Sequence, residues 1–377
     1  MGIYLDYAAS TPIDAEILSE VLTESETFGN PSSTHKFGKR AKSLLEASRT
    51  KIASYIGAAP QEIIITSGAT EANNLAIKGV VNLHKRPHII TTNIEHASVK
   101  TTYESLEETC DVTYINVKEN GIIDITELKE ALREDTVLVS IILVNNETGM
   151  IQPVYEIAQL LEGTDTLLHL DAVQAFGHVD VNVDDLQADL VSLSAHKIYG
   201  PKGVGILYCR KQTKLAPLLT GGAHEAGKRA GTENNMWAHA IERAMEKGIA
   251  HKTERNIKEM QLKELFINEL IRKEIPFDVN GDVNNASPHI INVYFPWVDV
   301  QVMLMALDMR DVYISGGSAC NSGSVKPSHV ITAMYDEARA NHSFRFSFSY
   351  LTSEEEIVKA VMAIEEVYKS IHTAVIE

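Results

Sequence analysis

The sequence predicts an α/β fold, in which helices cover a mostly parallel sheet, together with a smaller second domain. Short apolar runs alternate with longer amphipathic segments over the first 250 residues, a pattern typical of parallel strands joined by helical crossovers. The pattern of apolar and charged residues changes after about Lys252, where charged helical segments and shorter predicted strands begin. At 377 residues the chain also exceeds the size at which a single core keeps growing, so two domains are expected.

Six apolar runs bounded by turn residues have the length of buried strands. They are residues 62–66, 88–92, 137–143, 166–170, 190–193 and 204–208. Two predicted helices cover the sheet. One begins at Asp124 and carries Ile125, Leu128 and Leu132 on one face, and the other has Pro153 in its first turn.

The smaller domain is predicted as an α+β unit that ends in a long helix. Thr352 and Ser353 lie three residues before Glu355 and Glu356, which is the pattern of a capping box at a helix start. We therefore expect a large domain of residues 13–250. Residues 1–12 and 251–377 should form the small domain.

Charge, apolar runs and cysteine content limit the classes of function that the protein can have. The net charge of −17 argues against binding of a nucleic-acid backbone as the main activity, which needs a basic face, and leaves open a local basic patch for an RNA partner. No apolar run is long enough to span a membrane. The first residues lack a basic, cleavable leader, so a cytoplasmic enzyme is expected. Cys110, Cys209 and Cys320 are too few and too scattered for a disulfide framework or a zinc motif. Cys110 and Cys209 are predicted to be buried structural thiols.

The most informative segment contains Lys197, between a strand end and the glycine-rich turn that follows Tyr199. An isolated loop lysine is usually solvated. A second strand, however, ends in Asp171 and is followed by Gln174, and the carboxyl edge of a parallel sheet is where α/β folds bind ligands. If pyridoxal phosphate (PLP) is the ligand, Asp171 can keep its pyridine nitrogen protonated.

Three more strand ends carry polar residues. Ala69 and Thr70 open a helix after residues 62–66, and backbone N–H groups at a helix start can hold a phosphate. His96 follows residues 88–92, where an imidazole could stack on a flat cofactor and move protons. Asn146 follows the next strand and could donate to a carboxylate or a ring oxygen. Five strand ends are thus predicted to converge on one site.

These motifs resemble the cysteine desulfurases of the NifS and IscS type, within the aspartate-aminotransferase-like PLP enzymes of fold type I. The matching segments are residues 4–9, 29–35, 66–74, 95–96, 144–149, 171–174, 194–205, 231–232, 317–320 and 345–347. The resemblance implies a PLP-dependent homodimer that converts L-cysteine to L-alanine and passes sulfur to an acceptor protein. The acceptor could serve iron–sulfur cluster assembly or the thiolation of tRNA or cofactors.

The resemblance also implies residue roles. Lys197 would hold the cofactor covalently and move the substrate's α-proton, His96 would stack on the ring, and Asp171 and Gln174 would contact its nitrogen and phenolic oxygen. Ala69, Thr70, Ser194, His196 and, from the other subunit, Thr232 would hold the phosphate. Asn146 and Arg345 would receive the substrate carboxylate, and a guanidinium suits that task.

Cys320 is the predicted sulfur acceptor. It lies in a run of small residues, Gly316 to Ser324, that suits an exposed, mobile loop better than a core. The thiolate of Cys320 would attack the substrate sulfur and keep it as a persulfide.

Two positions depart from the family pattern. Ala226 stands where relatives often carry arginine, and residues 348–350 replace a glycine and a second arginine. Other interpretations of the sequence stay open. A selenocysteine lyase or an aminotransferase would share the lysine, aspartate and histidine but would not need Cys320. A homologue acting only as a binding scaffold would need none of these residues.

Overall fold

The central sheet of the protein contains seven strands in the part of the chain that the computed structural model describes, residues 2–319 and 325–374. Their order across the sheet is β4 (Asp111–Ile115), β3 (His88–Thr92), β5 (Thr136–Ile142), β6 (Leu167–Asp171), β7 (Leu190–Ser194), β8 (Gly205–Cys209) and β2 (Ile63–Thr66). β8 runs antiparallel to both β2 and β7, and all other neighbouring strands in the sheet are parallel. The sheet therefore matches the predicted mostly parallel arrangement.

All six predicted strands are present, with ends that shift by one residue at most. β4 lies outside the predicted set. It is an edge strand whose side chains are mostly half-buried, and polar Asp111 and Thr113 interrupt its apolar pattern. Asp124 caps α5 (Ile125–Ala131) as predicted, accepting from two backbone N–H groups. Pro153 occupies the N-cap of α6 (Val154–Leu161), one residue before its predicted place in the first turn.

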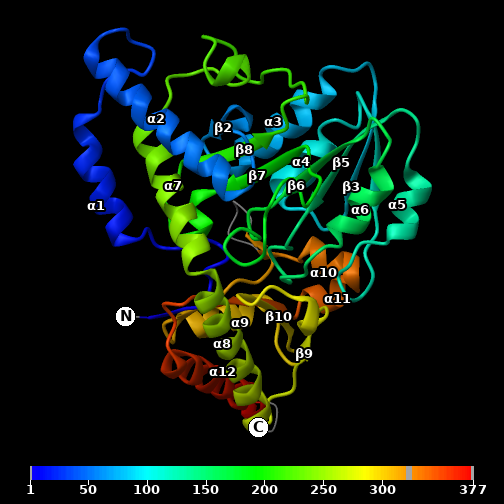
Figure 1. Ribbon diagram of the computed structural model, residues 1–377. Coiled ribbons are helices and arrows are strands. Elements are labelled where there is room, and N and C mark those ends of the chain that lie inside the picture. Colours follow the sequence, from blue (N-terminus) through cyan, green and yellow to red (C-terminus); the bar gives the residue numbers. More distant parts are fainter. Residues whose placement is uncertain (1, 320–324, 375–377) are drawn as a thin grey trace.

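Helices cover both faces of the sheet (Figure 1). Alternate strand residues point to opposite faces, so Ile63 and Ile65 pack with one helical layer and Ile64 packs with the other. The first layer consists of α1 (Ala15–Thr23), α2 (Lys36–Tyr55), α5, α6 and α7 (Asn235–Ala250). The second consists of α3 (Ala69–Val81) and α4 (Ala97–Glu104). The apolar runs of the strands are thus buried on both sides.

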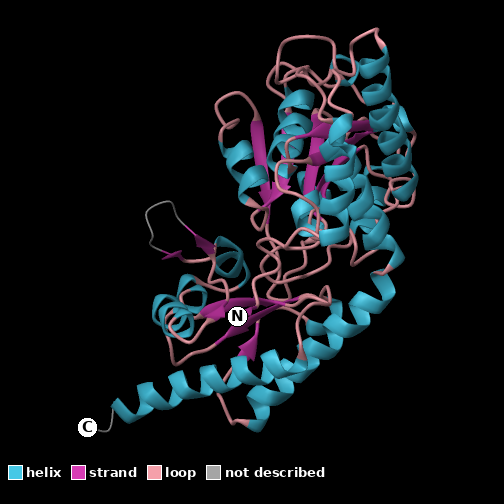
Figure 2. Cartoon of the chain, turned by 90° about the vertical axis from the view of Figure 1, so that its left-hand side faces the viewer, coloured by secondary structure: helices cyan, strands magenta, loops and turns pink. Residues whose placement is uncertain are grey.

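The C-terminal part of the chain forms a smaller unit below this sheet, with long helices along its outer side (Figure 2). Its strands are β14 (Ser343–Ser347), β10 (Ile290–Tyr294) and β9 (Asp278–Val279), with the pairs β1 (Ile3–Tyr4) and β11 (Val312–Tyr313), and β12 (Ser318–Ala319) and β13 (Val325–Lys326). Its helices are α8 (Lys252–Arg272), α9 (Val300–Asp308), α10 (His329–Met334), α11 (Glu337–Ala340) and α12 (Glu354–Ala374).

A separate hydrophobic cluster holds this unit together. It joins Leu5 to buried residues between Leu262 and Val367. The predicted capping box is present at the start of α12, where the N–H of Ser353 donates to Glu356 and the N–H of Glu356 donates to the Ser353 hydroxyl. The separate cores support our proposed division into residues 13–250 and residues 1–12 with 251–377.

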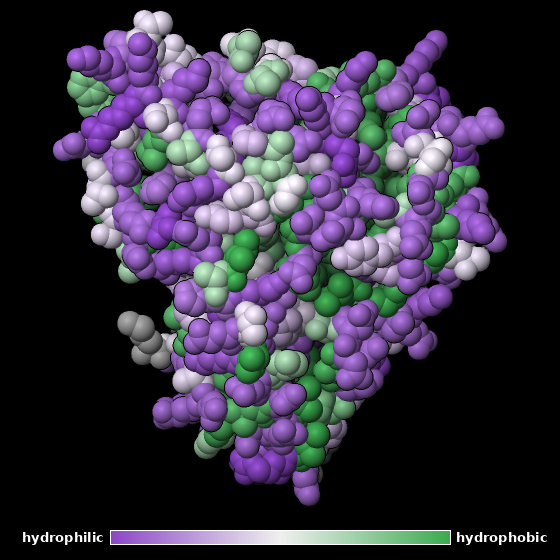
Figure 3. Space-filling view, viewed as in Figure 1, coloured by the Kyte–Doolittle hydropathy of each residue, from purple (hydrophilic) through white to green (hydrophobic). Residues whose placement is uncertain are grey.

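On the face shown in Figure 3, hydrophilic side chains cover most of the area and hydrophobic ones lie between them in small groups. Within residues 2–319 and 325–374, none of the helices is long and apolar enough to cross a membrane.

A buried ion pair attaches the loop after β8 to the large sheet. Glu225 accepts two hydrogen bonds from the Arg49 guanidinium, at 2.7 and 2.9 Å, and a third from the N–H of Ile65. The side chain of Glu225 is only 2% exposed. The loop carries Ala226, whose φ of 54° is left-handed, so this contact holds a strained backbone in place.

We predict that Arg49→Ala lowers the free energy of unfolding by about 3–5 kcal/mol, because it leaves the Glu225 carboxylate buried without its cation. Arg133→Ala is the matched control, since Arg133 pairs with Asp111 and Asp135 at the surface and should change little. Urea unfolding midpoints of the two variants measure the difference. Equal midpoints would show that the buried pair has no special importance.

Candidate active site

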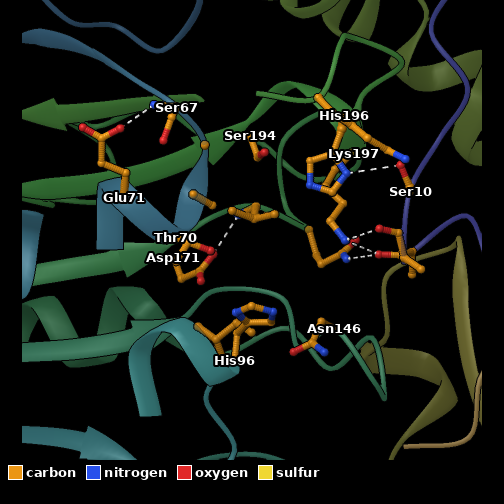
Figure 4. Close-up of a pocket in the computed structure, with 18 of the residues that line it drawn as sticks. Ser10, Ser67, Thr70, Glu71, His96, Asn146, Asp171, Ser194, His196 and Lys197 are labelled. Carbon is orange, nitrogen blue, oxygen red and sulfur yellow. Dashed lines mark hydrogen bonds between the residues drawn. The ribbon is translucent and has the colours of Figure 1, made fainter. Parts of the chain in front are cut away.

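The carboxyl ends of the parallel strands surround a cavity of about 620 Å³. The residues that follow β2, β3, β5, β6 and β7 all reach it, together with Ala8 to Ser10 and a residue of β14 (Figure 4). The cavity is lined by ten of the predicted site residues: Ala69, Thr70, His96, Asn146, Asp171, Gln174, Ser194, His196, Lys197 and Arg345. The structure therefore brings these side chains together, while their individual roles stay predictions.

Lys197 lies at the end of a short 3-10 helix, η3 (Ala195–Lys197), which follows β7. Its amine donates hydrogen bonds to the carbonyl oxygens of Ala8 and Ala9, at 2.6 and 2.8 Å. Burial, with a smaller contribution from the nearby Arg345 cation, lowers the pKa of this amine to about 8, against the opposing charges of Asp6 and Asp171. A significant fraction is thus neutral and nucleophilic near pH 7 to 8.

Asp171 and His96 are connected by two residues that had no predicted role, Asn73 and Ser98. The amide of Asn73 donates to both Asp171 and the Ser98 hydroxyl, each at 2.8 Å. The Ser98 hydroxyl then donates to Nδ1 of His96 at 2.8 Å, and the Ser98 N–H donates to the same nitrogen. Nδ1 is therefore an acceptor, so neutral His96 carries its proton on Nε2. Burial lowers the pKa of His96, and Lys197 adds to this shift, which favours the neutral ring.

Part of the cavity wall suits an anion. α3 begins at Ala69 directly after Gly68, whose φ of +148° favours glycine, and Gly68, Ala69 and Thr70 line the cavity at this helix start. Lys202 lines the same cavity. Burial, with Lys197 and Lys202, lowers the pKa of His196 to about 4, so this histidine is neutral. These groups suit a phosphate.

Arg345, on β14, lines the cavity, and its guanidinium already has partners. Its guanidinium forms an ion pair with Asp6 at 2.7 Å and donates to the carbonyl oxygen of Asn146 at 2.8 Å. Asp6 had no predicted role, although it belongs to the segment 4–9 that carries part of the resemblance. A carboxylate bound by Arg345 would have to share the guanidinium with Asp6.

Among the residues that the structure describes, two buried polar atoms of cavity residues have no hydrogen-bond partner: Oδ1 of Asn146 and Nε of Arg345. Unpaired buried polar groups are unfavourable unless a ligand satisfies them. Together with the depressed pKa of Lys197, the buried Asp171 carboxylate and the part of the wall that suits an anion, they give a cavity whose donors and acceptors fit PLP and an amino-acid carboxylate.

Two predicted site residues lie elsewhere. Thr232 is exposed and lines a smaller neighbouring cavity of about 170 Å³, beside Ser67 and Gly203. Its predicted contact with the phosphate of a second subunit stays a prediction. Cys320 lies outside the described residues, between β12 and β13 in sequence. Cys110 and Cys209 are buried free thiols, as predicted, and burial raises the pKa of both.

The departure at Tyr350 has a clear structural consequence. The rings of Tyr350 and Tyr199 lie 4.7 Å apart, and the Arg255 guanidinium lies 4.2 Å from the first ring and 5.0 Å from the second. The Tyr199 hydroxyl is also 2.6 Å from that of Ser349. Tyr199 follows Lys197 by two residues, so this cluster anchors the segment that carries the lysine.

Known proteins are similar to this chain in sequence and fold. The family model for class-V aminotransferases matches residues 3–360. The putative cysteine desulfurase IscS 1 of Bacillus subtilis is 45% identical over 97% of this chain and 98% of its own length. The cysteine desulfurase IscS of Dictyoglomus turgidum is 42% identical over 98% and 95%. The solved structure of a NifS-like protein is 33% identical and has a TM-score of 0.92 over 98% of this chain and 100% of its own.

The chain belongs to the class-V aminotransferase family, whose members share the PLP fold type I. Within that family it is of the NifS/IscS cysteine desulfurase type, and PLP is its cofactor.

We predict that Lys197 in the cofactor-free protein reacts with a neutral acylating reagent with a pH midpoint near 8, well below the value of about 10.4 for a free lysine. Asp6→Asn should move the midpoint to lower pH, because it removes an anion that raises the pKa of Lys197 and leaves Arg345 unopposed. Mass spectrometry of the Lys197 peptide measures the rate. A midpoint above pH 10, or an upward shift caused by the Asp6→Asn substitution, would contradict this electrostatic account.

Proposed function

We propose that this enzyme takes sulfur from L-cysteine, releases L-alanine, and stores the sulfur on Cys320 as a persulfide for an acceptor protein. The observation that carries the proposal is the setting of Lys197, a lysine with a depressed pKa beside Asp171 and His96 in the cavity. The 41–45% identity to named cysteine desulfurases supports the choice of substrate.

The geometry of the cavity supports a role for each cofactor residue. When bound, PLP supplies an electron-poor ring that stabilises negative charge at the substrate's α-carbon. Lys197 would hold the cofactor, Asp171 would keep the pyridine nitrogen protonated, and His96 would lie against the ring. Gln174 would donate to the phenolic oxygen. The phosphate would bind to Ala69, Thr70, Ser194 and His196.

The substrate residues are Arg345, Asn146 and Lys197. The guanidinium of Arg345, whose buried Nε has no partner among the described residues, and the amide NH₂ of Asn146 would donate to the carboxylate of cysteine. Once released from the cofactor, the Lys197 amine would remove the α-proton, because its depressed pKa suits a base near neutral pH. Binding by Arg345 orients the α-carbon toward this amine.

Cys320 would complete the sulfur transfer. Its thiolate forms a bond to the substrate sulfur, the carbon–sulfur bond of the substrate breaks, and the electron pair stays with the carbon. That carbon gains a proton and leaves as alanine. Cysteine and one thiol thus become alanine and one persulfide, with no added oxidant or reductant.

We infer a homodimer in which Thr232 reaches the partner's phosphate. The acceptor would feed iron–sulfur cluster assembly or the thiolation of tRNA or cofactors. A cytoplasmic location suits the unpaired thiols of Cys110 and Cys209.

Cys320→Ala should keep PLP and still bind cysteine, because the cavity residues remain. Sulfide or persulfide release should fall about a thousandfold or more, since the nucleophile is gone. Alanine formation and mass spectrometry of the trapped persulfide measure this, with Cys209→Ala as the control that retains activity. Full turnover in Cys320→Ala, or a persulfide found only on Cys110 or Cys209, would overturn the mechanism.

The shared site is tested by mixing two inactive chains, Lys197→Ala and Thr232→Ala. Mixed dimers carry one site with both residues intact, so an equal mixture should recover about a quarter of the activity of the unmodified enzyme. Each variant alone is the control. An active monomer in sedimentation would remove the basis of the shared site.

A further inference from the structure

A series of buried side chains extends from the cavity wall into the interior behind Gln174. The Gln174 oxygen Oε1 lies 3.2 Å from Nε2 of His289, and Nδ1 of His289 lies 2.7 Å from the Ser287 hydroxyl. Gln174, His289 and Ser287 are 5%, 4% and 0% exposed. Of these three residues, only Gln174 belongs to the proposed cofactor site.

The orientation of the Gln174 amide follows from its second partner. The Gln174 side chain lies 2.8 Å from the carbonyl oxygen of Ala8, which can only accept a hydrogen bond. The atom facing Ala8 must therefore be the NH₂ group, and Oε1 must face His289. One N–H of Gln174 is used by Ala8, and the other is left for the cavity that Gln174 lines.

This orientation determines the tautomer of His289. Oε1 of Gln174 is an acceptor, so Nε2 of His289 must carry a hydrogen. Burial holds the pKa of His289 well below its ordinary value, and the ring is therefore neutral with a single N–H. Four cationic or basic neighbours act in the same direction: His178, Lys263, Arg345 and Lys197. Nδ1 is then free to accept from the Ser287 hydroxyl.

The plane of the His289 ring is held by a second histidine. The rings of His178 and His289 stack at 3.6 Å with only 9° between their planes. Nδ1 of His178 lies 3.2 Å from the Glu259 carboxylate and 3.3 Å from the Asn256 side-chain oxygen. These contacts prevent the His289 ring from turning away from Gln174.

His178, Glu259 and His289 also offer ligand atoms within 4.8 Å of one another, as metal sites do. Stacked rings direct the lone pairs of their nitrogens within parallel planes, so the two histidines cannot both point at one ion between them. Both nitrogens of His289 already have partners. The arrangement favours a hydrogen-bonding role.

We infer that His289 is a positioning residue: its Nε2–H holds Oε1 of Gln174, so that the amide presents an N–H donor, and not its oxygen, to the phenolic oxygen of the cofactor. This inference rests on the proposed contact of Gln174 with that oxygen. Without His289, only the Ala8 carbonyl would hold the amide in this orientation, so its oxygen would be kept away from the negative charge of the cofactor less firmly.

The test is a pH titration of the visible absorbance of the bound cofactor in the complete enzyme. A hydrogen-bond donor to the phenolic oxygen stabilises negative charge on that oxygen. Loss of the donor therefore raises the pKa of the Lys197 nitrogen that is bonded to the cofactor. His289→Leu should raise the midpoint by up to about one pH unit. His289→Gln, which can supply an amide N–H in the same direction, should restore it. Ser287→Ala, which frees the tautomer of His289 without removing the ring, should give a smaller rise.

His88→Leu is the matched control. His88 is a buried histidine, 1% exposed, with both nitrogens bonded to threonine hydroxyls, and it does not line the cavity. Its loss should cost stability without moving the midpoint.

Gln174→Leu separates the two hypotheses. If it leaves the midpoint unchanged, the proposed contact of Gln174 with the cofactor is wrong, and the positioning by His289 falls with it. If it raises the midpoint while His289→Leu and Ser287→Ala do not, the contact stands and the inference about His289 is overturned. Equal shifts in His289→Leu and His88→Leu would also overturn it, because they would reflect lost packing alone.

Discussion

The carbonyl oxygen of Ala8 accepts hydrogen bonds from both Lys197 and Gln174, and the candidate site depends on this contact. The N-terminal segment crosses from one core to the other. Leu5 packs in the smaller hydrophobic cluster, and the N–H of Ala8 donates to Ser347 of β14. Thr11, at the other end of the segment, bonds the carbonyl oxygen of His196. A residue far from Lys197 in sequence thereby fixes where its amine lies.

The same segment sets the charge balance of the cavity. Lys197 and Arg345 are two cations near one another, which is unfavourable at low dielectric unless anions compensate. Asp6 pairs directly with Arg345, and Asp171 also lines the cavity. The pKa of Lys197 falls to about 8 because burial outweighs these anions. His96 and His196 are neutral beside it, since both have lowered pKa values.

Neutral histidines and amides can hold their orientation only through fixed partners. Asn73 and Ser98 fix the tautomer of His96. In the same way, the Ala8 carbonyl fixes the orientation of the Gln174 amide, and Gln174 and Ser287 together fix the tautomer of His289. One network supports Asp171 and His96, and the other supports Gln174. Each network contains a backbone group that can act in only one way, the Ser98 N–H as a donor and the Ala8 carbonyl as an acceptor, and this group fixes the direction of the other hydrogen bonds.

The sequence by itself determined the sheet and most of the cavity wall. Buried parallel strands are continuous apolar runs, and residues that follow them must meet at one edge, which is why His96, Asp171 and Lys197 could be placed together from the strand pattern alone. The edge strand β4 lacked that signal because its side chains are mostly half-buried and partly polar. Only the tertiary structure decided which residues orient the site. Lys197 bonds to Ala8, Arg345 to Asp6, and Gln174 to both Ala8 and His289. Each of these partners is more than 100 residues away in sequence. A local pattern of apolar residues cannot predict such contacts, because they form only when distant segments of the chain fold together.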